Sequence, residues 1–205
     1  MENRAVRKRR TILEAATTVF LDKGYDGTSM DDVARLAAVS KPTIYRYFPD
    51  KKRLFAAIVI TTTDQVNGLV RLVVETLPDD GDLERDLAEL ARRFLAALMK
   101  PQVLRLRRLV IANAERFPEV SRSWYEQGFG RVLATLAACF QRLADRKLLS
   151  LDDPMLSASH FVGLLLWIPL NQAMFTGRRG ATSKADLERY ARAAVRAFLA
   201  GYGRR

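Results

Sequence analysis

The stretch TSMDDVARLAAVSKPTIYRYFPDK, from Thr28 to Lys51, constrains the fold most, because it specifies two short helices joined by a tight turn. The hydroxyls of Thr28 and Ser29 can accept hydrogen bonds from the free N–H groups of a first helical turn, and two acids three residues on complete a capping box. Ser40 can cap the second helix, and Pro42 stands in its first turn, where a missing N–H costs little. This pattern predicts a helix-turn-helix.

Apolar residues at helical spacing indicate which side of each short helix is buried. The first helix has one such stripe, formed by Val33, Leu36 and Ala37. In the second helix, Ile44 and Phe48 lie four residues apart and are expected to point to the core. The other side chains of the segment 41–47 then face outward, and their amine, guanidinium, phenol and hydroxyl groups suit a nucleic-acid groove better than a core. We therefore expect a recognition helix here.

The outward-facing groups have different expected roles on DNA. Lys41 is the expected guanine contact, whereas Pro42 and Thr43 are expected to touch thymine methyl groups. Phosphate contacts are expected from Thr28, Ser29, Tyr45, Arg46 and Tyr47. Packing against the first helix of the chain is an equally good interpretation of Tyr47. Lys51 opens a further helix, where a cation is unfavourable unless an anion such as a phosphate lies nearby.

From Gly27 to Lys51 the sequence resembles the TetR family of transcriptional regulators. The resemblance is carried by the order glycine, Thr-Ser-Met, two acids, hydrophobic-Ala, small-Val-Ser-Lys, x-Thr-hydrophobic-Tyr-x-Tyr-Phe and a lysine. It implies a DNA-binding head in which Lys51 anchors the DNA backbone. Ala38 departs from the pattern, because family members usually carry glycine there. If this residue is left-handed, alanine costs about 1 kcal/mol.

Residues 101–170 resemble the C-terminal region of the AefR-like branch of that family. The resemblance is carried by LRLRRLVIANAERFPEVSRSWYEQGFGRVLATLA and by DDPMLSASHFVGLL. It implies a helical body that dimerises. Family members commonly bind a small molecule in this body and lose DNA affinity when the two heads change spacing.

The net charge of +11 is concentrated toward the N-terminus, as expected of a chain that binds a polyanion through its front part. Residues 1–53 hold 12 Lys and Arg against 7 Asp and Glu, and the remaining 152 residues hold 22 against 16. The first ten residues are especially basic and include Arg4, Arg7, Lys8, Arg9 and Arg10. Two interpretations of this segment are open: a frayed, solvated terminus, or an arm that touches phosphates or enters the minor groove.

Other classes of protein find little support in the sequence. Cys139 is the only cysteine, so a disulfide within the chain is impossible, and a reduced, cytoplasmic protein is expected. The longest apolar run, Phe161 to Leu170, is about half of the ~20 residues that cross a bilayer, so we expect a soluble protein with no membrane partner. Because the sequence has no glycine-rich phosphate loop, HExxH or GxSxG motif, we expect no catalysis, no cofactor and no metal.

The rest of the chain predicts helices only, and hence an all-α fold. The first helix is expected to run to about Lys23, and the fourth from near Lys51 to about Leu77, ahead of a linker at residues 78–82. Later breaks are expected near Pro101, Pro118, 150–154 and 176–183, with one long helix through Trp124, Val132, Leu136 and Phe140. We divide the chain into a helix-turn-helix DNA-binding domain, residues 1–50, and a ligand-binding and dimerisation domain, residues 51–205.

The last two predicted helices, about Pro154 to Phe175 and Lys184 to Tyr202, bear on assembly. The first has apolar side chains on more than one face, so one side can face its own body while the other needs a partner. A matching stripe on the final helix is formed by Leu187, Ala191, Ala194, Val195 and Phe198. In the family these two helices pair with their twofold copies as a four-helix bundle, so a homodimer is expected.

Aromatic and apolar residues of the body are the candidate walls of an effector pocket. They are Phe94, Met99, Leu106, Trp124, Tyr125, Phe129, His160, Phe161 and Trp167. Plain core packing is the commoner role of such residues. His160 is the only histidine, so the sequence contains no histidine cluster.

Together these patterns predict a transcriptional repressor that binds a palindromic operator in double-stranded DNA as a homodimer and is released by a small-molecule effector. Two recognition helices set about 34–36 Å apart read a palindrome, whereas one reads only a few base pairs. An activator or dual regulator on the same fold is the alternative, because the residues do not separate the two. A small all-helical enzyme and a membrane-surface protein are the alternatives outside this class.

Overall fold

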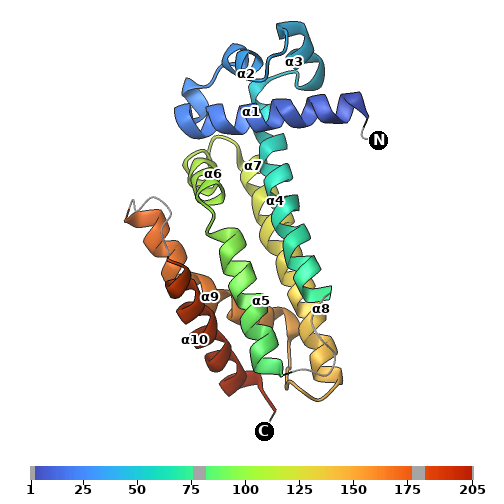
Figure 1. Cartoon of the computed structure of the whole chain (residues 1–205), viewed down its shortest axis with the longest axis vertical. Coiled ribbons are helices and arrows are strands. Elements are labelled where there is room, and N and C mark those ends of the chain that lie inside the picture. Colours follow the sequence, from blue (N-terminus) through green and yellow to red (C-terminus); the bar gives the residue numbers. More distant parts are fainter. Residues whose placement is uncertain (1–2, 76–81, 177–182, 205) are drawn as a thin grey trace. The chain divides into compact units, whose positions relative to one another are not determined.

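The described residues form helices joined by short turns (Figure 1). The computed structural model describes residues 3–75, 82–176 and 183–204. The helices are α1 (Arg4–Gly27), α2 (Met30–Leu36), α3 (Lys41–Tyr47), α4 (Lys51–Glu75), α5 (Leu83–Leu98), α6 (Pro101–Ala112), α7 (Pro118–Ser123), the π-helical η1 (Trp124–Gly130), α8 (Arg131–Asp145), α9 (Pro154–Phe175) and α10 (Lys184–Tyr202). Within the described ranges, β pairing is limited to one isolated bridge between Leu149 and Gly203. The predicted all-α fold is confirmed, and most of the predicted linker, residues 78–81, lies outside the described residues.

The helices group into two compact units. The first contains residues 1–63 and 105–124, and the second contains residues 64–104 and 125–205. The division therefore falls inside α4, later than the predicted boundary after residue 50. The reason is that the first half of α4 buries its apolar side chains with the helix-turn-helix, and that α6 and α7 add to the same core.

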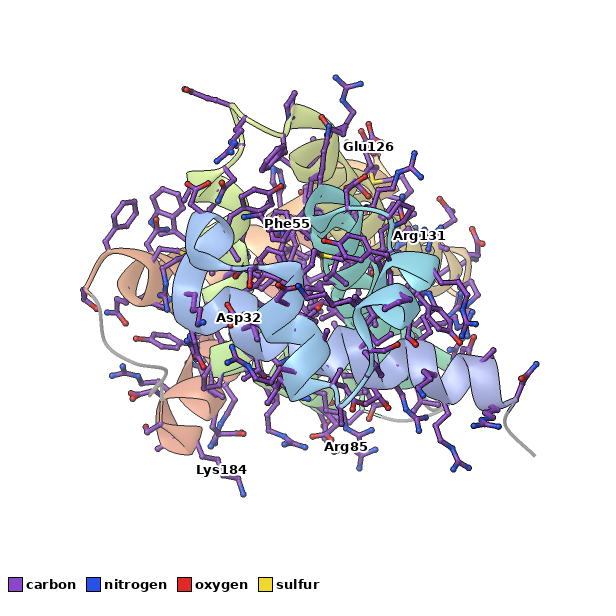
Figure 2. All side chains as sticks on the ribbon, turned by 90° about the horizontal axis from the view of Figure 1, so that it is seen from above. Asp32, Phe55, Arg85, Glu126, Arg131 and Lys184 are labelled. Carbon is purple, nitrogen blue, oxygen red and sulfur yellow. The ribbon has the colours of Figure 1, made fainter. Side chains whose placement is uncertain are left out.

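Aromatic rings from distant parts of the sequence form the core of the first unit. Phe20 of α1 stacks on Phe55 of α4 with ring centroids 5.4 Å apart, and both side chains are fully buried. Tyr25 at the end of α1 lies 4.5 Å from Phe117, the residue before α7. Phe55 can be found near the centre of Figure 2. These contacts fix the end of α1 against α4 and α7, directly ahead of α2.

The core of the second unit lies where α8, α9 and α10 meet. Phe140 and Phe161 form an edge-to-face pair with centroids 5.4 Å apart, and Phe198 lies 5.0 Å from the first ring and 5.1 Å from the second. All three side chains are buried, so the loss of one ring is expected to cost about 3–5 kcal/mol of stability. α5 packs on α10 and completes this core.

The apolar stripe of α10 faces this core rather than a partner. Ala191, Val195 and Phe198 are at most 1% exposed within the single chain. The expectation that the stripe meets a second copy is therefore wrong. It fails because helical spacing shows that one face is buried without showing which neighbour buries it. On α9, by contrast, Phe161 and Leu165 are buried whereas Trp167 remains 74% exposed, so its two apolar faces are confirmed.

The regular helix at the start of α1 ends near Lys23, as predicted, and a short helical turn follows a bend at Gly24. Gly24 has φ +71°, a left-handed conformation that glycine adopts without steric cost, and helical residues continue beyond it to Gly27. The hydroxyl of Thr28 donates to the carbonyl oxygen of Gly24 at 2.6 Å and closes the bend. The bend therefore sets the direction in which the chain enters α2.

The predicted long helix through Trp124 is interrupted by a wider turn. Residues Trp124–Gly130, WYEQGFG, form the π-helix η1 between α7 and α8. The side-chain N–H of Asn67 on α4 donates to the carbonyl oxygen of Gln127 at 2.5 Å, so part of the irregular backbone is bonded by a side chain. Periodicity alone did not reveal this change, because α and π turns present similar apolar patterns over so short a segment.

Candidate nucleic-acid interface

An N-cap hydrogen bond and the ion pairs of Asp32 hold α2 in place. The hydroxyl of Ser29 accepts a hydrogen bond from the backbone N–H of Asp32 at 3.1 Å, as the predicted cap requires. The Asp32 carboxylate accepts hydrogen bonds from Lys23, at 2.8 Å, and from Arg35. The hydrogen bond from Lys23, followed by that from Ser29, lowers the pKa of Asp32. α2 is thus tied both to its own first turn and to α1.

Two of the three predicted stripe residues of α2 are buried, and one is not. Val33 and Ala37 are at most 5% exposed, whereas Leu36 is 54% exposed. The expectation for Leu36 is therefore wrong, because α2 ends at this residue and the chain turns before the side chain reaches the core.

The turn between α2 and α3 contains a strained alanine. Ala38 has φ +52°, in the left-handed region where glycine is favoured. The following N–H, of Val39, donates to the carbonyl oxygen of Ala34 at 2.9 Å and closes the end of α2. The turn is therefore formed in spite of the alanine, as expected, with a cost on the order of 1 kcal/mol.

α3 occupies the predicted recognition helix, Lys41–Tyr47. The Ser40 hydroxyl accepts the backbone N–H of Thr43 at 3.3 Å and is hydrogen-bonded to the Thr43 hydroxyl at 2.8 Å. Ile44 and Phe48 are at most 4% exposed and anchor the helix on the first core. The opposite side is open: the exposed side chains are Lys41, Pro42, Tyr45 and Arg46, and Thr43 and Tyr47 are half-buried.

Tyr47 packs on the core of the first unit, in agreement with the second interpretation given for it. The guanidinium carbon of Arg46 lies 5.4 Å from the centre of the Tyr47 ring. Tyr47 therefore supports the position of Arg46, and only the remaining exposed part of its ring is open to a DNA backbone.

Lys41 makes an ion pair across the turn. Its Nζ atom lies 2.6 Å from Oδ2 of Asp31 in the first turn of α2. The hydrogen bond to Asp31 raises the pKa of Lys41 above its usual value. Sequence reasoning placed Lys41 at the DNA surface but missed this partner, ten positions away in the chain.

Lys51 and Thr28 are placed differently from the expectation. The ammonium of Lys51 donates to the carbonyl oxygens of Tyr25 and Thr28 at 2.8 and 2.9 Å, and it lies 3.4 Å from that of Asp26. Its Nζ also lies 4.5 Å from the centre of the Tyr25 ring. Thr28 is only 3% exposed, and its hydroxyl is bonded to Gly24. In this arrangement both residues hold the end of α1, so neither presents a free donor to a phosphate.

The basic N-terminal residues form part of α1 and are not frayed within the described residues. Asn3 accepts the N–H of Ala5 at 3.0 Å and caps the helix, which begins at Arg4. The guanidinium carbon of Arg9 lies 5.4 Å from the Phe48 ring, at the end of α3. The structure therefore shows a helix here and not an extended arm that could enter the minor groove. The basic side chains of residues 4–10 lie on the surface of α1.

The nine candidate pocket residues do not gather at one site. Leu106 and Trp124 belong to the core of the first unit, and Phe94, Phe161 and Phe129 to that of the second. Of the other four, Met99 is buried beside Leu104 and Ala173, Tyr125 is exposed and stacks on Phe129 with ring centroids 6.3 Å apart, His160 is hydrogen-bonded to Tyr202, and Trp167 is exposed on α9. The His160 Nδ1 is 2.5 Å from the Tyr202 hydroxyl, so the imidazole has a structural partner.

A groove lies in the second unit between α4 and α5, and Phe94 is the candidate pocket residue that lines it. It has a volume of about 260 Å³ and an apolar floor that includes Val70, Leu90 and Phe94. Arg92 and Lys100 lie on its rim. The sequence did not predict the groove, because its walls come from two helices and helical spacing does not show which faces of the two lie opposite each other.

Two further findings concern the described ranges. No helix there combines the length and the apolar character needed to span a bilayer. In the same part of the chain, no three His, Cys, Asp or Glu side chains gather in a way that could hold a metal ion.

Comparison with known proteins agrees with this geometry. Residues 12–58 match the family described as bacterial regulatory proteins, tetR family, and residues 85–204 match the C-terminal domain of AefR-like transcriptional repressors. A solved structure from Mesorhizobium loti MAFF303099, described as a TetR-family transcriptional regulator, is 52% identical with a TM-score of 0.94, over 99% of this chain and 100% of that one. The flavonoid-responsive regulator FrrA is 27% identical with a TM-score of 0.76, over 97% and 98% of the two chains.

Two curated relatives match about a third of the chain. The transcriptional activator FasR of Mycolicibacterium smegmatis is 37% identical over 73 residues, which are 36% of this chain and 33% of FasR. The negative transcriptional regulator IcaR of Staphylococcus aureus is 34% identical over 61 residues, 30% of this chain and 33% of IcaR. The match thus spans about a third of the length of these relatives.

The capped helix-turn-helix with an exposed α3, joined to an all-helical body, defines the class of helix-turn-helix transcriptional regulators. The two family matches together cover residues 12–58 and 85–204, and the second alone covers more than half of the chain. The chain belongs to the TetR family, with a C-terminal domain of the AefR-like type.

Proposed function

We propose that the chain is a repressor that binds a palindromic operator as a homodimer, with α3 of each copy in a major groove. The observation that carries the proposal is the open face of α3, which is held on the core by Ile44 and Phe48 while its polar side chains remain exposed. A helix fixed in this way presents its N-terminal side chains to base edges.

The exposed side chains divide into base readers and phosphate contacts. Lys41 is proposed to donate to the O6 and N7 acceptors of a guanine, and Pro42 and the Thr43 methyl to contact thymine methyls. Ser29, Tyr45 and Arg46 are proposed to bind phosphates on either side. Thr28 and Lys51 are left out of this set because Thr28 is buried and the Lys51 ammonium is bonded to backbone carbonyls, whereas Ser29 is exposed.

An exposed apolar face on α9 supports the homodimer. Leu156, Leu164, Trp167, Ile168 and Phe175 are 44–85% exposed in the single chain and recur along one side of the helix. An apolar side of this length is rarely left in water. Neighbouring α10 exposes small residues, among them Ala193 and Ala197, which allow a second helix to approach closely. We propose that α9 and α10 form a four-helix bundle with their copies.

A small-molecule effector is proposed to bind in the second unit and to weaken DNA binding. The α4–α5 groove, with its apolar floor and its basic rim of Arg92 and Lys100, offers space for such a molecule. FrrA, a relative along nearly the whole chain, is described as flavonoid-responsive, which supports a ligand-responsive regulator without identifying the ligand of this one.

Activation is the second candidate, and it has a specific observation in its favour. FasR, an activator, is 37% identical over 73 residues, slightly above IcaR, a negative regulator, at 34% over 61 residues. The sign of regulation depends on where the operator lies relative to the promoter, so both outcomes use the same α3 contacts. A cytoplasmic location fits either outcome.

Selection from a random duplex library tests the proposal. The purified chain is expected to enrich a motif with twofold symmetry and to bind it with an affinity that falls steeply with salt, because Lys and Arg release counterions from phosphates. A promoter reporter carrying the motif, with and without the gene, then separates repression from activation. Failure to enrich any motif at modest ionic strength would remove the proposed function.

A further inference from the structure

The side chain proposed to read guanine is held by a carboxylate from the neighbouring helix. Nζ of Lys41 lies 2.6 Å from Oδ2 of Asp31, and the two side chains are 65% and 54% exposed. Asp31 stands in the first turn of α2 and Lys41 in the first turn of α3. The pair therefore bridges the starts of the two helices on the outer surface of the helix-turn-helix.

The helix dipoles explain why the pair forms. A helix N-terminus carries a partial positive charge, so Asp31 is favoured at the start of α2 and Lys41 is disfavoured at the start of α3. The carboxylate compensates for the misplaced cation. Asp32 cannot take over this task, because its two oxygens are bonded to Lys23 and Arg35.

We propose that Asp31 is a specificity-determining residue: by holding the Lys41 ammonium, it suppresses contacts of Lys41 with DNA phosphates and leaves recognition of a guanine edge as the favoured alternative. The inference rests on the proposed role of α3 in reading an operator. Asp31 acts through Lys41, so it is a positioning residue and does not itself contact a base.

Magnitudes support this selection. An exposed ion pair contributes at most about fivefold to an equilibrium constant, so it can compete with one screened phosphate contact. A lysine or arginine on the O6 and N7 acceptors of guanine discriminates by roughly 5-fold to 100-fold against other bases, which is enough to displace the carboxylate. A phosphate that approaches Lys41 also approaches the Asp31 carboxylate, and this like-charge repulsion disfavours the non-specific complex.

The test compares Asp31→Asn with a matched control, Asp22→Asn. Asp22 also forms an exposed ion pair within the first unit, with Arg105 at 2.9 Å, so both variants remove one negative charge from an exposed pair, although Arg105 keeps its hydrogen bond to the Leu21 carbonyl. The probes are a mixed-sequence duplex pool and the consensus duplex selected by the unmodified chain. We expect Asp31→Asn to bind the mixed pool about fivefold more tightly, with a log–log salt slope steeper by about one, while binding to the consensus changes less than twofold. Asp22→Asn is expected to keep the specificity ratio of the unmodified chain.

A double variant that also lacks the Lys41 ammonium shows whether Asp31 acts through Lys41. In Lys41→Met, the further change Asp31→Asn is expected to have no effect on either probe beyond that of Asp22→Asn. Thermal unfolding should fall only slightly in Asp31→Asn, because asparagine lacks the negative charge that the start of α2 favours. If that variant does not fold, Asp31→Ser takes its place, because serine is also short, polar and uncharged.

The outcomes separate this inference from the proposed function. Enrichment of a motif by the unmodified chain, with equal specificity ratios for Asp31→Asn and Asp22→Asn, would overturn the role of Asp31 alone. Loss of preference at a cytosine in Asp31→Asn would also overturn it, because Asp31 would then be reading a base. No enrichment at all would remove the proposed function, and this inference with it.

Discussion

The Nζ atom of Lys51 lies 2.8 Å from the carbonyl oxygen of Tyr25 and so joins the start of α4 to the end of α1. The same ammonium bonds the Thr28 carbonyl, and together these contacts satisfy acceptors that the bend at Gly24 leaves outside the regular helix. Lys51 therefore fixes the corner from which α2 starts, a role that differs from the phosphate contact expected from the sequence.

Removal of this ammonium is expected to lower stability. In Lys51→Met the carbonyls of Tyr25 and Thr28 lose charge-assisted hydrogen bonds, so the free energy of unfolding should fall by about 2 kcal/mol. Urea unfolding measures the change. The salt slope of DNA binding should stay as in the unmodified chain, because Lys51 displaces no counterion. A stable Lys51→Met variant with a shallower slope would show that Lys51 binds a phosphate after all.

Tyr45 and Arg46 should behave in the opposite way. Tyr45→Phe removes only a hydroxyl, and Arg46→Gln removes a charge from the exposed side of α3, so neither change should move the thermal transition measurably. Both are expected to weaken binding to all duplexes several-fold, and Arg46→Gln should make the log–log salt slope shallower by about 0.9. Fluorescence anisotropy titrations over a range of salt concentrations check this. A marked loss of thermal stability would instead assign the residue to packing.

Ala38→Gly is expected to stabilise the chain. Glycine relieves the left-handed strain at φ +52°, worth about 1–2 kcal/mol, but it also makes the unfolded state more flexible by about 0.4–1 kcal/mol. The net gain should be on the order of 0.5–1 kcal/mol in urea unfolding, with the selected DNA motif unchanged. Ala96→Gly, at an exposed position inside α5, is the control and should destabilise. Equal losses in both variants would show that the turn is not strained.

Trp167→Glu should break the homodimer. Trp167 is 74% exposed in the single chain, and a carboxylate there would be buried between two copies of α9. Sedimentation velocity is expected to show monomers, and binding to a palindrome is expected to fall to the level of binding to a single half-site. Tyr125→Glu, at a 66% exposed aromatic on η1, is the matched control and should remain a dimer. Dimers in both variants would move the interface away from this face of α9.

The helix-turn-helix was predictable because its determinants are local. Ser29 and Ser40 bond N–H groups three residues away, so the bounds of α2 and α3 follow from short-range pattern. The left-handed conformation of Ala38 was suggested only by the family resemblance, because family members usually carry glycine at this position.

Contacts between distant segments were not predictable in this way. Lys51 meets carbonyls 23 to 26 positions earlier, and no spacing rule indicates which acceptors a lysine will find. The apolar stripe of α10 would have the same helical spacing whether it packed on its own chain or on a second copy. The candidate pocket residues were chosen by type, and the structure distributes them over two cores because burial, and not ligand binding, explains most large apolar side chains.

The π-helical segment Trp124–Gly130 limits how this chain can change in length. A π turn is closed by hydrogen bonds between residues five apart, so it holds one residue more than an α turn. Deletion of one residue here would convert the wide turn into an α turn, and Val132, Leu136 and Phe140 of α8 would keep their places in the core. The same deletion inside α8 would instead rotate every later side chain by about 100°. Loss of one residue is therefore tolerated at η1 and disruptive in the helix that follows.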